Sequence, residues 1–85
     1  MVKLNENIRI LRRRLSLTQD QFAQKLGIKR SLVGAYEEGR AEPRLELMQK
    51  MAEIFSMSVD QLIGQDFSAG AQPVMKSYER GKEVV

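Results

Sequence analysis

The sequence predicts an all-α fold: one compact domain of five short helices followed by a flexible C-terminal tail. Apolar residues in the first 63 positions recur at spacings of three and four, the period of an amphipathic helix. Two Ser/Thr-x-x-Gln patterns, at Thr18 and Ser58, mark helix starts. A chain of 85 residues has room for one modest core, so several domains are excluded.

The first two helices follow from an apolar stripe and a capping box. A helix over residues 5–15 is predicted by four apolar residues on one face, which are Leu4, Ile8, Leu11 and Leu15. Thr18 and Gln21 form a capping box that starts a second helix. Gly27 ends this helix after about eight residues, because glycine adopts the left-handed conformation at low cost.

A third helix, over residues 30–38, must turn sharply away from the second, because only Ile28 and Lys29 separate it from Gly27. Its inward face carries Val33 and Tyr36, and Gly39 closes it.

Pro43 is predicted to open the fourth helix, where its fixed φ does no harm. The core stripe of this helix is Leu45, Met48, Met51, Ala52 and Phe55. A second capping box, Ser58 with Gln61, starts a short fifth helix that ends near Gly64.

The helical pattern fails after Asp66, so residues 1–65 are assigned to the domain and residues 66–85 to a linker or tail. The segment "SAGAQP" is small, polar and interrupted by glycine and proline. Two interpretations of the tail stay open, a solvated linker or an arm that docks on a partner.

Charge and composition exclude several function classes. Residues 1–44 carry ten lysines and arginines against five acidic residues, whereas residues 45–85 carry four against six. The basic half therefore faces an anionic partner or is a solvated surface. The chain has no cysteine and no histidine, and no nucleophile is paired with a base, so we expect no enzyme, no metal site and no cofactor. No apolar run reaches membrane-spanning length, and we expect a cytoplasmic protein.

The stretch from Leu17 to Ile63 resembles the phage-repressor type of helix-turn-helix domain, the Cro/cI or XRE family. The resemblance rests on Leu17-Thr18-Gln19, the Leu26-Gly27 turn, Val33 and Tyr36, Glu37, Gly39, Pro43 and Ser58-Val59-Asp60. It implies a lambda-repressor-like fold and a sequence-specific transcriptional regulator, a repressor, whose third helix enters the major groove of double-stranded DNA.

The resemblance also implies the roles of single residues. Base contacts fall to Arg30, Ser31, Gly34 and Ala35, and phosphate contacts to Gln19, Lys29, Arg40 and Arg44. Arg12 and Glu37 would form an ion pair that joins the first helix to the end of the third. A homodimer on a palindromic operator is implied, with Leu47, Ile54 and Met57 as the candidate dimer surface. Longer family members carry a further C-terminal domain, to which residues 66–85 would lead.

The sequence departs from the family pattern at two helix ends and in the third helix. Ser16 and Ser56 stand where the family usually carries glycine, so those helix ends are either strained or shaped differently. Lys29 replaces a Ser or Thr N-cap, and Gly34 and Ala35 replace larger polar readers. Gly34 would instead let the backbone sit deep in the groove.

One alternative function uses the same fold. An antitoxin or protein-interaction module would bind a protein partner through the tail, and loss of the tail, not of Arg30, would then abolish activity.

Overall fold

The computed structural model describes residues 4–67, and these residues form five helices and no strand. The helices are α1 (Leu4–Arg14), α2 (Gln19–Leu26), α3 (Arg30–Glu37), α4 (Leu45–Ile54) and α5 (Val59–Gly64). The all-α, five-helix prediction is confirmed. Most of the predicted tail, residues 68–85, lies outside the described residues.

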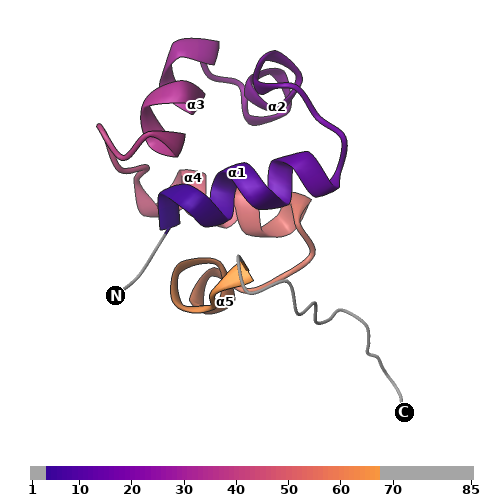
Figure 1. Ribbon diagram of the computed structural model, residues 1–85, viewed down its shortest axis with the longest axis vertical. Helices are drawn as coiled ribbons and strands as arrows, with labels where there is room; N and C mark the ends of the chain where they lie inside the picture. Colours follow the sequence, from indigo (N-terminus) through magenta and orange to yellow (C-terminus); the bar gives the residue numbers. More distant parts are fainter. Residues whose placement is uncertain (1–3, 68–85) are drawn as a thin grey trace.

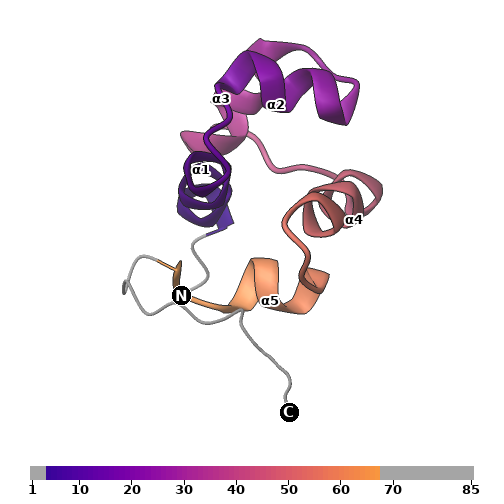
Figure 2. The same cartoon turned by 90° about the vertical axis from the view of Figure 1, so that its right-hand side faces the viewer.

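The helix α1 runs through the middle of the molecule, with α2 and α3 on one side of it and α5 on the other (Figure 1). The helix α4 packs on α2 and on α5 (Figure 2). Apolar side chains from all five helices and from the segment after α5 meet in one core. Its buried members are Ile8, Leu11, Phe22, Ala23, Leu26, Val33, Met51, Phe55, Leu62 and Phe67. The rings of Phe22 and Phe55 stack within it, with their centroids 5.4 Å apart.

Both predicted capping boxes are present. The Thr18 hydroxyl accepts the Gln21 N–H at 3.0 Å, and the Gln21 side chain accepts the Thr18 N–H at 2.9 Å. The Ser58 and Gln61 pair repeats this arrangement at the start of α5. Each box satisfies donors that the first turn of a helix leaves free.

Four helices end in the same way, with one residue in the left-handed conformation. The residue is glycine after α2 and α3, where Gly27 and Gly39 have φ of 75° and 78°, but serine after α1 and α4, where Ser16 and Ser56 have φ of 59°. The following N–H closes each turn, as when Leu17 donates to the Arg12 carbonyl at 3.2 Å. The two serine ends therefore keep the shape of a glycine end and carry the strain that a side chain causes there.

Three expectations for the fold are corrected. Pro43 does not open α4, because an extended residue, Arg44, lies between Pro43 and the helix as its N-cap. Leu15 and Leu45 are 46% and 56% exposed and do not belong to the core. Both lie at a helix end, where the periodic face extends beyond the neighbouring elements that would cover it.

Phe67, which the sequence pattern places in the tail, is only 4% exposed. The fully buried Asn7 holds this segment: its Nδ2 donates to the carbonyls of Leu62 at 2.8 Å and Gln65 at 2.6 Å, and its Oδ1 accepts the Phe67 N–H at 3.4 Å. Arg14 donates to the Phe67 carbonyl at 3.1 Å and lies over its ring. The domain thus extends through Phe67.

Replacing either Ser16 or Ser56 by glycine is expected to stabilise the protein. Glycine removes a left-handed penalty of about 1–2 kcal/mol but makes the unfolded chain more flexible, so the expected net gain is about 0.5–1 kcal/mol at each site. Ser31→Gly, inside α3, is the matched control and should instead cost about 0.5 kcal/mol. Urea denaturation measures all three, and equal losses at the three positions would show that the serine ends are unstrained.

Candidate nucleic-acid interface

The turn between α2 and α3 fixes where the third helix points. Gly27 ends α2 in the left-handed conformation, and the Ile28 N–H donates to the Ala23 carbonyl at 3.0 Å. Lys29 is the N-cap of α3 and makes no side-chain capping bond. The first N–H groups of α3 therefore have no cap from the Lys29 side chain, and they remain able to meet an anionic partner.

Two exposed cations, Lys29 and Arg30, lie at this helix start. Lys29, Arg30 and Ser31 are all exposed. The side chains of Lys29, Arg30 and Arg44 make no hydrogen bond or ion pair with other residues in the 4–67 range. Their charges are thus uncompensated by the fold, and an external anion can pair with them at little cost.

A buried ion pair joins α1 to the end of α3, and it is the pair that the family resemblance implies. Arg12 Nε donates to Glu37 Oε2 at 2.6 Å and Arg12 Nη2 to Glu37 Oε1 at 3.1 Å, with the two side chains 9% and 3% exposed. Arg12 Nη1 also donates to the Leu17 carbonyl at 2.6 Å. This two-bond geometry fixes both side chains, because the guanidinium fork matches the carboxylate.

Gln19 extends this pair to the start of α2. Its Nε2 donates to Glu37 Oε1 at 3.0 Å, so one of its two amide hydrogens is already used inside the protein. The half-buried Gln19 is therefore held in place by Glu37, a contact that the sequence analysis did not anticipate.

Gly34 lies beside Gln19 but is not required by packing. A Cβ at position 34 would lie 4.0 Å from Gln19 Nε2 and Oε1, which is ordinary contact. Gly34 also lies within α3 and has no positive φ that would favour glycine. Among the described residues, nothing explains the absence of a side chain at this position.

Ala35, an expected base contact, is only 8% exposed. The turn after α3 folds back over this residue, since the Arg40 N–H donates to the Ala35 carbonyl at 2.9 Å. Ala35 therefore offers much less surface to a partner than Arg30 or Ser31.

The remaining predicted residues differ in their surroundings. Arg40 pairs with Glu38 at 2.7 Å, but both side chains are more than 60% exposed, so the pair is weak and easily exchanged. Arg44 is exposed at the N-cap of α4. The candidate dimer residues Leu47, Ile54 and Met57 are half-buried and pack against the core, which leaves part of each accessible.

The described residues contain no group of His, Cys, Asp and Glu side chains that is able to hold a metal ion. None of the described helices has the length and apolar character needed to cross a membrane.

Comparison with known proteins identifies the family of this arrangement. The sequence model of the helix-turn-helix family matches residues 8–62, which run from the core of α1 into α5. The match therefore includes the buried ion pair, the whole of α3 and the N-terminus of α4.

Two relatives carry names that describe different roles, a transcriptional activator and an antitoxin. The chain is 31% identical over 62 residues to the HTH-type transcriptional activator BcrR of Enterococcus faecalis, covering 73% of this chain and 30% of BcrR. It is 33% identical over 63 residues to the antitoxin PezA of Streptococcus pneumoniae, covering 74% of this chain and 40% of PezA. The chain thus spans less than half the length of these relatives.

Solved structures share the fold. The restriction-modification controller protein C.AhdI from Aeromonas hydrophila is 31% identical with a TM-score of 0.66, over 73% of this chain and 94% of that chain. The P22 c2 repressor, solved in complex with a synthetic operator, has a TM-score of 0.69 over 74% of this chain and 96% of that chain. At 24% identity, the second likeness concerns the fold alone.

Removing Arg12 is expected to be far more damaging than removing Arg40. Arg12→Met leaves the buried Glu37 carboxylate without its cation, which costs about 3–5 kcal/mol, whereas Arg40→Ala breaks an exposed pair worth about 0–1 kcal/mol. Urea denaturation measures both variants.

The double variant Arg12→Met/Glu37→Leu separates the effect of the unpaired charge on the free energy of unfolding from the effect of altered packing. It should be more stable than Arg12→Met and should recover folding if the single variant does not fold. Equal losses for Arg12→Met and Arg40→Ala would contradict the importance of the buried pair.

Proposed function

The chain belongs to the helix-turn-helix family of the XRE type, and on this premise we propose that it binds double-stranded DNA in a sequence-specific way and regulates transcription as a repressor. The observation that carries the proposal is the start of α3. There, Lys29, Arg30 and Ser31 are exposed and the two cations are unpaired within residues 4–67, while the other end of the helix is fixed by Glu37. A rigid helix with free cations at its exposed N-terminus suits a DNA major groove.

Arg30 and Ser31 are the proposed base readers. A guanidinium can donate to guanine O6 and N7 together, and a serine hydroxyl can donate or accept, so Arg30 carries most of the discrimination. Gly34 is proposed to let the α3 backbone approach the bases closely, because its missing side chain has no other explanation among the described residues. Ala35 has only a minor part in this scheme, given its burial.

Phosphate contacts are proposed for Gln19, Lys29, Arg40 and Arg44. Gln19 Nε2 gives one hydrogen to Glu37, which leaves its second hydrogen for a phosphate oxygen. Arg40 would exchange its exposed partner Glu38 for a phosphate. These contacts position the protein on the duplex and read no sequence.

We further propose a homodimer on a palindromic operator, with half-sites about 34 Å apart. The accessible parts of Leu47, Ile54 and Met57 are the proposed dimer surface. A DNA partner agrees with the cytoplasmic location expected from the sequence, and no enzyme activity is part of the proposal.

The alternative is a protein-interaction module, and the similarity to PezA supports keeping it as a second candidate. In that case the main activity would reside in residues 68–85. Phe67 must be retained in any test of this alternative, because it belongs to the core.

Selection of bound sequences from random duplex DNA at fixed salt tests the proposal. We expect a palindrome, and we expect Arg30→Ala to bind it about 5- to 100-fold more weakly and to relax selection at one base pair in each half-site. Arg9→Ala, an exposed arginine on α1, is the matched control and should keep the same preferred sequence. If the folded protein selects no DNA motif, sequence-specific binding is rejected. If removal of residues 68–85 abolishes the activity while Arg30→Ala keeps it, the protein-interaction alternative is favoured.

Gly34→Ala is expected to separate stability from DNA binding. Alanine fits without a clash and favours the helix, so the free energy of unfolding should rise by about 0.5–1 kcal/mol, while the added methyl group weakens binding to the selected DNA. Gly64→Ala is the control: it lies in α5, has open space around it, and should change stability alone. Denaturation and DNA titration measure both, and unchanged DNA affinity in Gly34→Ala would reject the close-approach role.

A further inference from the structure

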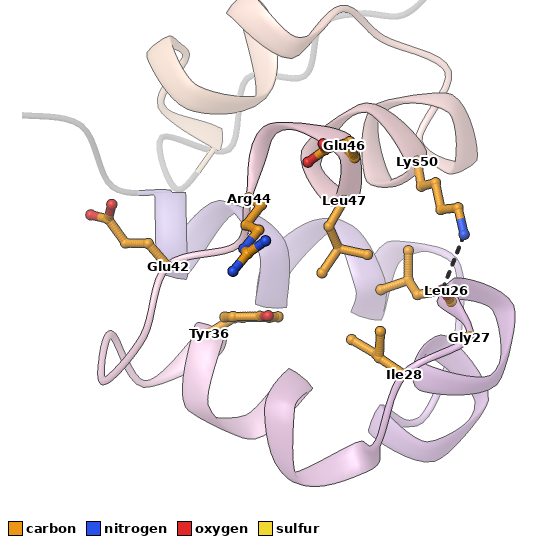
Figure 3. A pocket seen from close by; sticks show the side chains of 9 residues that line it. All are labelled: Leu26, Gly27, Ile28, Tyr36, Glu42, Arg44, Glu46, Leu47 and Lys50. Carbon is orange, nitrogen blue, oxygen red and sulfur yellow. Dashed lines mark hydrogen bonds between the residues drawn. The ribbon is translucent and has the colours of Figure 1, made fainter.

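A cleft of about 390 Å³ lies between the end of α2, the inner side of α3 and the first turns of α4 (Figure 3). Leu26, Ile28 and the Tyr36 ring form its apolar floor, and Leu47 points toward them from α4 on the opposite side. The cleft persists because α4 packs on α2 and α5, with little contact to α3. Its volume falls within the range of about 300–1,000 Å³ that is usual for small-molecule sites.

The cations around this cleft lie close to its apolar floor, whereas the carboxylates point away from it. Figure 3 shows the Arg44 guanidinium above the Tyr36 ring and the Lys50 ammonium leaning toward Leu26, where Nζ lies 3.5 Å from the Leu26 carbonyl oxygen. The carboxylates of Glu42 and Glu46 point away from the apolar floor in the same view. Neither Arg44 nor Lys50 has a carboxylate partner within residues 4–67. The apolar floor is therefore bordered by two cations that have no anion.

We propose that this cleft binds a small amphiphilic anion, an aromatic or aliphatic carboxylate. The apolar body would cover Leu26, Ile28 and Tyr36, and the carboxylate would pair with Arg44 and Lys50 at the edge. Hydrogen bonds between ionised partners are the stronger ones, and they select an acid over a neutral molecule of the same shape. A cationic ligand is disfavoured, because the two cations face the floor and the two carboxylates do not.

Arg44 links the cleft to DNA binding, and this step rests on the proposed function. The same guanidinium is a proposed phosphate contact, so a bound carboxylate and a DNA phosphate compete for it. Occupation of the cleft then lowers the affinity for DNA, as an effector would. The cleft itself is present in the free protein and does not depend on DNA.

The site is tested by titrating the full chain with three matched probes and measuring the backbone amide shifts by NMR. The probes are 3-phenylpropanoate, 3-phenylpropanamide and 3-phenylpropylamine, which share a ring and differ in charge. We expect saturable shifts at Leu26, Ile28, Tyr36 and Leu47 with a Kd on the order of 1 mM for the acid, weaker binding of the amide and the weakest binding of the amine. Unsaturable shifts, or equal binding of all three probes, would overturn the proposal.

A pair of lysine variants separates charge recognition from a structural effect. Lys50→Ala should weaken binding of the acid about three- to fivefold and leave binding of the amide unchanged. Lys25 is an exposed lysine on α2 outside the cleft, so Lys25→Ala should change the binding of neither probe. If Lys50→Ala lowers the affinity for the acid and for the amide equally, recognition of the carboxylate is rejected. If the acid binds but does not reduce affinity for the selected DNA, the competition step fails while the site stands; if no DNA sequence is selected, the site is still judged by the probe titration alone.

Discussion

The buried pair of Arg12 and Glu37 is the interaction on which the arrangement of α1, α2 and α3 depends. Each carboxylate oxygen of Glu37 accepts a hydrogen bond from Arg12, and Oε1 also accepts one from Gln19. Burying two charges is costly unless their hydrogen-bonding capacity is satisfied, so the geometry tolerates little displacement. The pair therefore acts less as a source of stability than as a joint that sets the orientation of α3 relative to α1. Because Gln19 belongs to the same joint, the start of α2 and the end of α3 are set together.

Stability and function place opposite demands on α3. A helix of eight residues gains little from its own hydrogen bonds, and Gly34 weakens it further. Lys29 adds no capping bond at its start. The losses are offset by tertiary contacts at the inward face, where Val33 is fully buried and Glu37 is tied to Arg12. The outward face has no side chain at Gly34 and carries unpaired cations at its start, which is the division expected of a helix whose partner lies outside the protein.

Local signals in the sequence were sufficient for most of the fold. Capping boxes and the Gly27 helix end involve residues a few positions apart, so their geometry follows from the sequence alone. The burial of Ala35 and Phe67 was not predictable in this way, since each depends on a segment that folds back or on a distant partner. Asn7 is the clearest case: a polar residue on α1 gives no sign of its contacts 55 to 60 positions away. Likewise, the family resemblance implies the ion pair, whereas the contact of Gln19 with Glu37 follows only from the way α2 packs on α3.

The helix α1 holds segments on two of its sides through polar contacts. On the side of α3, Arg12 holds Glu37; on the side of α5, Asn7 and Arg14 hold Phe67. All three side chains come from one helix of 11 residues, so both sets of contacts share one backbone element. The position of Phe67 is thus fixed relative to α3 through contacts that both start from α1.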